Sequence, residues 1–297
     1  MALPDLGVPL RSRFVDGAGV RLHLVEAGPD DGPLVVLLHG FPEFWYGWRH
    51  QIGPLARAGW RVWAPDQRGY GQSSAPPDVA AYDVDRLADD VLALLDAAGA
   101  ERAPVVGHDW GAVVAWWLAM RDPDRVERLA VLNVPHPLAY RELVLRSPSQ
   151  VARSWYVAFF QLPALPERAL RRFGTRALRL SSAPGTSASP SPSGFSDADL
   201  ARYRAAWARP GAARGMISWY RAAARRAGRL HPGDPEVRPP TLILWGEDDV
   251  ALDARLAGRS LAYCADGRLV TFPGVSHWVQ HEAADAVTRE LLAFLSE

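Results

Sequence analysis

Short apolar runs alternate with helical patterns along most of this chain, and this alternation restricts the fold more than any other feature. Most of the runs are continuously apolar, as strands buried on both faces of a parallel sheet require. Between them, apolar residues recur on one helical face, as at Val84, Leu87, Val91 and Leu95. The predicted strands are Val20 to Glu26, Leu34 to Leu38, Arg61 to Ala64, Pro104 to Gly107, Leu129 to Asn133, Thr241 to Trp245 and Leu269 to Phe272. The sequence predicts an α/β fold with a mostly parallel central sheet flanked by helices.

The alternation stops between Val134 and Pro240, where no strand-like run occurs and the pattern is helical and rich in aromatic residues. We therefore expect a helical cap inserted between two core strands. The predicted division is 1–135 for the first part of the core, 136–232 for the cap and 233–297 for the second part. Within the cap, Ser181 to Ser196 is rich in Ser, Pro and Gly and is predicted to be a mobile excursion, more typical of a tolerated surface insertion than of a gate.

Composition excludes several classes of protein. The 33 arginines balance 33 acidic residues, so no net charge attracts nucleic acid, and no nucleic-acid partner is expected. No apolar run is long enough to span a bilayer, and the N-terminal stretch lacks the unbroken apolar segment of a secretory signal, so we expect a cytoplasmic protein with no membrane partner. The single Cys264 and the absence of paired ligands at metal-binding spacing predict neither a disulfide nor a metal site, and no cofactor is expected. Arginine-rich stretches at Arg168 to Arg179 and Arg221 to Arg229 are interpreted as solvated helix faces rather than a site for an acidic partner.

Three segments at predicted strand ends carry the candidate chemistry. Gly107-His108-Asp109-Trp110-Gly111 follows a strand and opens a helix, and its small residues permit a sharp turn that lifts the central side chain above the sheet. Asp109 is therefore the candidate nucleophile, although in isolation such an aspartate is more often a helix cap. The segment His39-Gly40-Phe41-Pro42 follows an earlier strand, so the backbone N–H groups of Phe41 and Trp110 are expected to form an oxyanion hole.

The acid and base of a catalytic triad are expected after the last two strands. Thr241 to Trp245 continues into Gly246-Glu247-Asp248-Asp249, and the final strand is followed by His277. Asp109, Asp249 and His277 then occur in the chain order of an α/β-hydrolase triad. Asp249 is preferred as the acid because Gly246 to Asp249 resembles the Gly-x-x-Asp pattern of these hydrolases, and Asp248 in the same loop remains an alternative.

Over nearly its whole length the chain resembles the epoxide hydrolase branch of the α/β-hydrolase superfamily. The resemblance rests on three motifs, His39 to Glu43, Asp66 to Gly71 and Gly107 to Gly111, and on two cap motifs, Ser154-Trp155-Tyr156 and Ser218-Trp219-Tyr220-Arg221. It implies an α/β-hydrolase fold with a helical cap whose Tyr156 and Tyr220 hold the epoxide oxygen. Beyond these residues, the expected substrate-binding side chains are Phe41, Trp110, Trp155, Phe159 and Trp278.

An aspartate nucleophile suits the opening of an epoxide. Asp109 is ionised at neutral pH without help from a base, and its attack on an sp³ carbon gives an ester that water activated by His277 can hydrolyse, while Asp249 orients the imidazole. The expected substrate is a small apolar or aromatic epoxide, and the expected product is a vicinal diol. The alternatives are a haloalkane dehalogenase-like hydrolase, which shares the ester chemistry, and a non-catalytic ligand-binding homologue.

Overall fold

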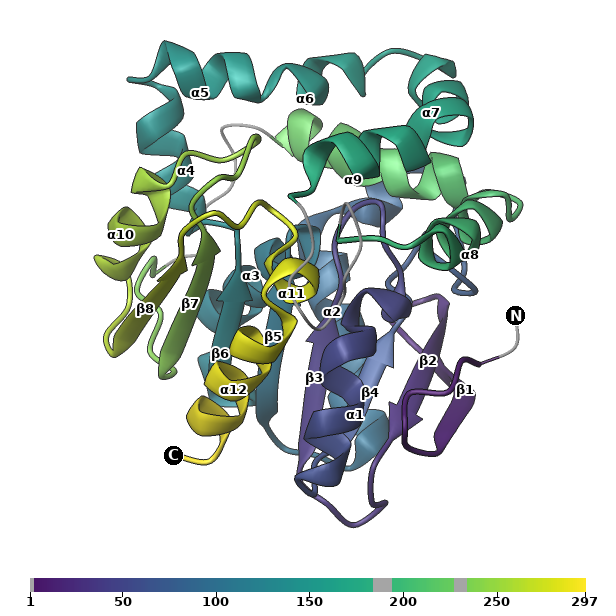
Figure 1. Ribbon diagram of the computed structural model, residues 1–297, viewed down its shortest axis with the longest axis vertical. Helices are drawn as coiled ribbons and strands as arrows, with labels where there is room; N and C mark the ends of the chain where they lie inside the picture. Colours follow the sequence, from purple (N-terminus) through teal and green to yellow (C-terminus); the bar gives the residue numbers. More distant parts are fainter. Residues whose placement is uncertain (1–2, 184–193, 227–233) are drawn as a thin grey trace.

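A single eight-stranded sheet forms the centre of the protein in the computed structural model, which describes residues 3–183, 194–226 and 234–297 (Figure 1). The strands are β1 Leu10–Asp16, β2 Arg21–Ala27, β3 Leu34–Leu38, β4 Arg61–Pro65, β5 Ala103–His108, β6 Val126–Leu132, β7 Thr241–Gly246 and β8 Gly267–Phe272. Their order across the sheet is β1-β2-β4-β3-β5-β6-β7-β8. Pairing is parallel from β4 to β8 and antiparallel for β1 with β2 and β2 with β4. The predicted α/β-hydrolase architecture is confirmed by this mostly parallel sheet.

All seven predicted strands are present, but β1 was missed. Its sequence, LRSRFVD, alternates weakly because β1 pairs only with β2 at the edge of the sheet, where Arg11, Ser12 and Phe14 stay exposed. An edge strand of this kind lacks the continuous apolar run that marks a central strand. The predicted strand ending at Asn133 instead spans Val126–Leu132, and Asn133 lies just beyond it.

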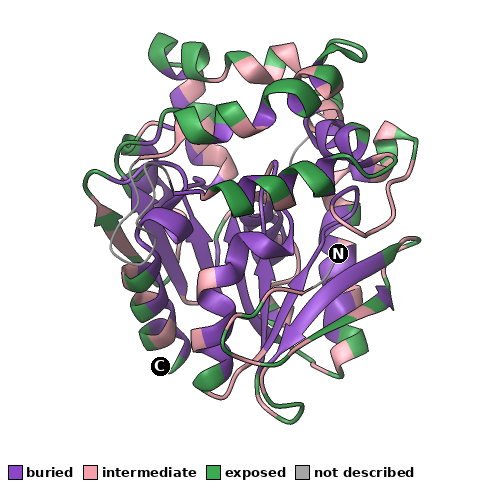
Figure 2. Cartoon of the chain, turned by 45° about the vertical axis from the view of Figure 1, so that its right-hand side comes forward, coloured by how far each residue is buried: buried purple, intermediate pink, exposed green. Residues whose placement is uncertain are grey.

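Helices cover both faces of the sheet (Figure 1). On one face, α1 (Arg49–Arg57) packs against α12 (Ala284–Leu295) and the short α11 (Val279–Glu282). On the other, α2 (Val84–Ala98) packs against α3 (Trp110–Arg121), and α10 (Arg255–Leu261) lies beside β8. Figure 2 shows that the central strands are buried, and that the exposed residues lie on the outer helical surfaces, the loops and the edge strands β1 and β8. Among the helices in the described ranges, none is both long enough and apolar enough to cross a bilayer.

Six further helices lie over the carboxyl ends of the strands (Figure 1). They are α4 (Pro137–Val144), α5 (Pro148–Arg153), α6 (Trp155–Phe159), α7 (Leu165–Ser181), α8 (Asp197–Trp207) and α9 (Ala212–Arg226). The described part of 134–240 contains no strand, only an isolated bridge between Val237 and Cys264. Most of the predicted excursion, residues 184–193, and the predicted cap boundary at 232 fall outside the described residues. The boundaries 136 and 232 therefore stay predictions.

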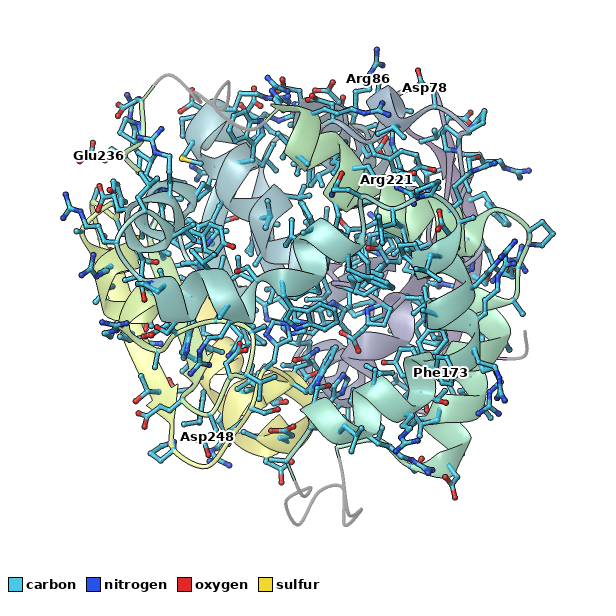
Figure 3. All side chains as sticks on the ribbon, turned by 90° about the horizontal axis from the view of Figure 1, so that it is seen from above. Asp78, Arg86, Phe173, Arg221, Glu236 and Asp248 are labelled. Atoms are coloured by element: carbon cyan, nitrogen blue, oxygen red, sulfur yellow. The ribbon has the colours of Figure 1, made fainter. Side chains whose placement is uncertain are left out.

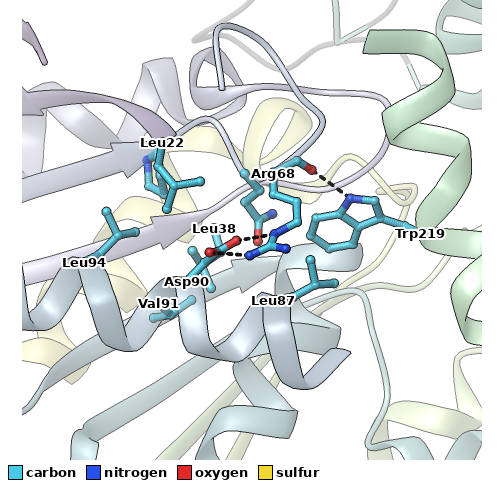
Figure 4. A pocket seen from close by; sticks show the side chains of 10 residues that line it. Leu22, Leu38, Arg68, Leu87, Asp90, Val91, Leu94 and Trp219 are labelled. Atoms are coloured by element: carbon cyan, nitrogen blue, oxygen red, sulfur yellow. Dashed lines mark hydrogen bonds and ion pairs between the residues drawn. The ribbon is translucent and has the colours of Figure 1, made fainter. Parts of the chain in front are cut away.

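The loop after β4 joins the sheet to the cap through Arg68 (Figure 4). The Arg68 guanidinium donates two hydrogen bonds of 2.7 Å to the Asp90 carboxylate on α2, and it is 2% exposed. The indole N–H of Trp219 on α9 donates to the carbonyl oxygen of Arg68 at 3.0 Å. The cavity beside these residues measures only about 10 Å³, which is too small for an organic substrate. This part of the Asp66 to Gly71 motif therefore has a structural role.

Candidate active site

Asp109 lies at a sharp turn between β5 and α3. Its backbone has φ 47° and ψ −124°, a conformation that L-residues rarely adopt and that lifts the side chain away from the sheet. A Cβ at Gly111 would lie 2.1 Å from the carbonyl oxygen of Leu38, and a Cβ at Gly107 would lie 2.5 Å from the carbonyl oxygen of Gly111. Only glycine permits these approaches. The sequence thus forms the strained turn that the Gly107 to Gly111 pattern predicts.

The loop after β3 brings a backbone donor to this carboxylate. The Phe41 N–H donates a hydrogen bond of 2.6 Å to Oδ1 of Asp109. Trp110 is the first residue of α3, so its N–H belongs to the group of amides at a helix N-terminus that lack intrahelical partners. His39 is buried and structural, since its Nε2 accepts a hydrogen bond from the Gln67 N–H.

His277 stands between two carboxylates. Its Nδ1 lies 2.7 Å from Oδ2 of Asp249, and its Nε2 lies 3.4 Å from Oδ2 of Asp109. Parallel strands bring these residues together, because their carboxyl ends share one edge of the sheet. The structure therefore assembles Asp109, Asp249 and His277 in one group.

The two neighbouring acids, Asp248 and Asp249, differ in burial and in their contacts. Asp249 is 2% exposed, whereas Asp248 is exposed and lies at the periphery in Figure 3. Oδ1 of Asp249 accepts hydrogen bonds from the N–H groups of Ala251 and Leu252, and Oδ2 accepts one from the side-chain amide of Asn133 at 3.0 Å. Asp249 is held with the oxygen Oδ2 directed to His277.

Asn133 orients this acid from the end of β6. Its side-chain oxygen accepts a 2.8 Å hydrogen bond from the Gly246 N–H, and its amide nitrogen donates to the Gly246 carbonyl oxygen as well as to Asp249. Its φ of 49° places it in the left-handed region, which asparagine tolerates better than most residues. In the sequence, Asn133 was recognised only as the end of a predicted strand.

The group is electrostatically coupled. Burial alone would raise the pKa of both Asp109 and Asp249, but hydrogen bonds and charge from His277 lower each of them below its usual value. Burial alone would lower the pKa of His277, but the two carboxylates, with Asp249 the stronger influence, raise it well above its usual value. The two carboxylates therefore favour the protonated form of His277, and His277 favours the ionised form of both carboxylates.

Two cap tyrosines lie next to one another near this group. Tyr156 belongs to α6 and Tyr220 to α9, and their ring centroids are 5.9 Å apart. Tyr220 also contacts Phe41 at 5.2 Å and Trp110 at 5.0 Å. Burial raises the pKa of each tyrosine, and the charge of Asp109 raises it further. Both phenols therefore keep their protons at neutral pH and can donate hydrogen bonds.

The other side chains expected to bind substrate lie in different places. Phe159 is half-buried and contacts Phe160. Trp278 is 5% exposed and packs beside His277, where its indole N–H donates to Oγ of Ser181. Trp155 is 66% exposed, and the structure does not bring it to the site. A neighbour of a site residue on a short helix points elsewhere, because successive side chains are about 100° apart.

Sequence reasoning missed two contributors. Phe160 belongs to an aromatic cluster with Tyr156, Tyr220, Phe41 and Trp110. Its ring centroid lies 4.6 Å from that of Tyr220 and 5.2 Å from that of Phe41. Glu43 is fully enclosed behind the site, 3.3 Å from Nδ1 of His108, whose Nε2 contacts the carbonyl oxygen of His277 at 2.9 Å. Glu43 was visible in the His39 to Glu43 motif, but nothing in the spacing indicated its contacts.

Comparison with known proteins agrees with the class that this fold and site define. Residues 33–284 match the alpha/beta hydrolase fold family. The chain is 42% identical over 290 residues to the AB hydrolase superfamily protein YfhM of Bacillus subtilis, covering 96% of this chain and 98% of that one. It is 38% identical to Epoxide hydrolase A of Mycobacterium tuberculosis, covering 98% of each chain.

A solved structure is similar over the same length. The crystal structure of Epoxide Hydrolase A from Mycobacterium thermoresistibile superposes with a TM-score of 0.84 at 36% identity, covering 97% of this chain and 98% of that one. The chain belongs to the epoxide hydrolase branch of the α/β-hydrolase superfamily.

Proposed function

We propose that this protein hydrolyses small apolar or aromatic epoxides to vicinal diols through a covalent ester on Asp109. The observation that carries the proposal is an ionised aspartate at the strand-to-helix turn, with a backbone donor on one oxygen and a histidine beside the other. Relatives named epoxide hydrolases support the same substrate class. An aspartate that attacked an acyl ester would have to form an anhydride, whereas attack on an epoxide carbon gives an ester that water can cleave.

The two oxygens of Asp109 are proposed to have different roles. Oδ1 accepts the Phe41 N–H, so Oδ2 attacks the epoxide carbon as the C–O bond of the ring breaks. The released electron pair stays on the epoxide oxygen, which takes a proton from Tyr156 or Tyr220. Water then loses a proton to His277 and adds to the Asp109 carboxyl carbon, and Oδ1 carries the developing charge toward the Phe41 N–H. Collapse of this intermediate breaks the bond between the carboxyl carbon and the substrate oxygen, which takes the proton of the added hydroxyl, so the diol leaves and the carboxylate is restored. The proton held by His277 returns through water to the tyrosine that protonated the epoxide oxygen.

Formation of the ester prepares His277 for the second step. In the resting site the charge of Asp109 helps to raise the pKa of His277. The ester carries no charge, so the pKa of His277 falls and the neutral imidazole can act as a base. Asp249 then stabilises the imidazolium that forms.

The two steps should therefore respond differently to acid. Ester formation needs only ionised Asp109, whose lowered pKa keeps it charged in mildly acidic solution. Hydrolysis needs neutral His277 and should slow by about tenfold per pH unit below the pKa of that residue in the ester. Single-turnover fluorescence at acidic and neutral pH should follow ester formation and hydrolysis. Intact-mass spectrometry of quenched samples should show the ester accumulating at acidic pH. Loss of ester formation over the same pH range as hydrolysis would contradict these roles.

Removal of either phenol tests whether the reaction is epoxide opening. A hydrogen bond to a developing oxyanion contributes roughly 1.5 to 3 kcal/mol, which corresponds to about a tenfold to hundredfold loss in rate. Tyr156→Phe and Tyr220→Phe should each slow ester formation from an aryl epoxide by such a factor, and the double variant should be nearly inactive.

A matched control for the phenol variants is Tyr263→Phe, because Tyr263 hydrogen-bonds Glu142 outside the aromatic cluster. This variant should form the ester at the rate of the unmodified protein. Unchanged ester formation in both cap variants would favour the dehalogenase-like alternative, as would release of halide from haloalkanes without turnover of epoxides.

A further inference from the structure

Charge is divided unequally between the cap and the core. Residues 137–226 contain 15 arginines and four acidic residues, whereas the rest of the chain contains 18 arginines and 29 acidic residues. The neutral total therefore conceals a strongly basic cap on an acidic core. A basic surface of this kind attracts anionic partners over a distance of about 10 Å at moderate salt.

The basic residues on α7 share its outer face. Pro166, Leu170, Gly174 and Leu178 are buried, which fixes the inner side of the helix. The opposite side carries exposed arginines and exposed large apolar residues. Because successive positions are about 100° apart, these residues form one continuous strip along the helix. We call this strip the α7 outer face; its residues are Leu165, Arg168, Arg172, Phe173, Arg176, Arg179 and Leu180.

Large apolar side chains are unusually exposed in the same region. On the α7 outer face, Leu165 is 50%, Phe173 56% and Leu180 75% exposed. The preceding helices and loops add Leu145 at 78% and Trp155 at 66%. Figures 1 and 3 place α5, α6 and α7 on the same side of the molecule, with Phe173 on α7. Phe14 is the exposed large apolar side chain on β1, away from this region.

A hollow of about 430 Å³ lies between α7 and α8. Its lining includes Arg176, Arg179 and Arg204 together with Thr175 and Asp197. Arg179 pairs with Asp197, and Arg204 donates to Thr175 at 3.3 Å, so Arg176 adds a further cation to the lining. Guanidinium groups bind phosphate oxygens well.

We propose that the α7 outer face and the adjoining α5–α6 surface bind an anionic lipid membrane. Arginines would contact lipid phosphates, including one in the hollow, while Leu165, Phe173 and Leu180 enter the boundary between headgroups and acyl chains. The apolar side chains are dispersed among cations, which suits an interface with lipids better than the apolar centre and polar rim of a protein interface. This also accounts for the exposure of Trp155, which the substrate site does not use.

The proposal does not depend on the chemistry proposed for Asp109. If apolar epoxides are the substrates, a cap that touches a membrane would meet them where they concentrate. Binding to vesicles is measured without any substrate, so its failure and a failure to open epoxides are separate results.

Co-sedimentation with vesicles tests the proposal. The full chain should bind vesicles of phosphatidylcholine mixed with phosphatidylglycerol and should bind phosphatidylcholine alone weakly. Each arginine near an anionic surface contributes about fivefold in binding, so Arg168→Ser/Arg172→Ser/Arg176→Ser should weaken binding by about a hundredfold. Leu165→Ser/Phe173→Ser/Leu180→Ser should also weaken it, while turnover of a water-soluble epoxide is unchanged.

The matched control is Arg102→Ser/Arg259→Ser/Arg289→Ser, which removes three exposed arginines from the core. It changes net charge by the same amount and should leave vesicle binding intact. Equal loss in the control, equal binding to both kinds of vesicle, or no binding to either would overturn the proposal.

Discussion

Asp109→Ala is expected to lower diol formation by at least about 10⁴-fold, the scale on which enzymes lose activity with their nucleophile. The ester cannot form without the carboxylate, and no other acid of the described chain is placed to replace it, since Asp249 is enclosed by Asn133 and backbone donors. Chromatography of the diol after incubation with an aryl epoxide measures the loss. Diol formation above about one per cent of the normal rate would be incompatible with Asp109 as nucleophile.

The control for this variant is Asp248→Ala. Asp248 is the neighbour of Asp249, but it is exposed, so its removal should leave turnover nearly unchanged. Thermal unfolding of both variants shows whether the fold is intact. Alanine has a Cβ, as aspartate does, so the substitution does not change the backbone strain at φ 47°, and the turn should be retained.

The sequence predicted the central sheet better than its edges. Strands β3 to β7 are enclosed on both faces and leave continuous apolar runs, as in Leu34–Leu38, which matches its prediction at both ends. Strand β1 pairs with one strand and buries only Val15, so the alternation of apolar and polar residues along it was too weak to indicate a strand. A strand that is buried on both faces leaves a continuous apolar run in the sequence, and an edge strand does not.

The site was predicted to the extent that it depends on strand ends. Asp109, Asp249 and His277 follow β5, β7 and β8, and the topology alone brings them together. The cap contacts depend on how helices pack, and spacing along a helix does not fix which side chain faces the core. Phe160 was therefore missed as a member of the cluster, while its near neighbour Trp155 was assigned to the site and lies outside it.

The choice between Asp248 and Asp249 as the proposed acid shows the same limit at a single turn. Asp248 and Asp249 are adjacent, and in the sequence only the Gly-x-x-Asp pattern from Gly246 to Asp249 distinguished them. The backbone decides between them, because the Asp248 N–H donates to the carbonyl oxygen of Val275 while the Asp249 side chain turns inward to Asn133 and His277. Such a decision depends on contacts from β6 and the loop after β8, both distant in the sequence.

Replacement of His277 with glutamine should stop the reaction after the ester has formed. The glutamine side chain has no basic nitrogen, so it could not accept the proton of the attacking water. Asp109 would lose its contact with the imidazole, yet its ordinary pKa still leaves it ionised at neutral pH. His277→Gln should therefore form the ester and fail to hydrolyse it.

Intact-protein mass spectrometry after exposure to an aryl epoxide would measure this outcome. One added substrate mass per chain is expected, and peptide mapping should locate it on Asp109. The double variant His277→Gln/Asp109→Ala should show no adduct, which excludes reaction at another nucleophile such as the half-buried Cys264. Normal steady-state turnover in His277→Gln would show that His277 does not activate the water. The absence of an adduct in a folded variant that binds substrate would contradict the ester mechanism. Accumulation of the adduct on Asp109 would instead establish the order of events, with the aspartate acting before the histidine.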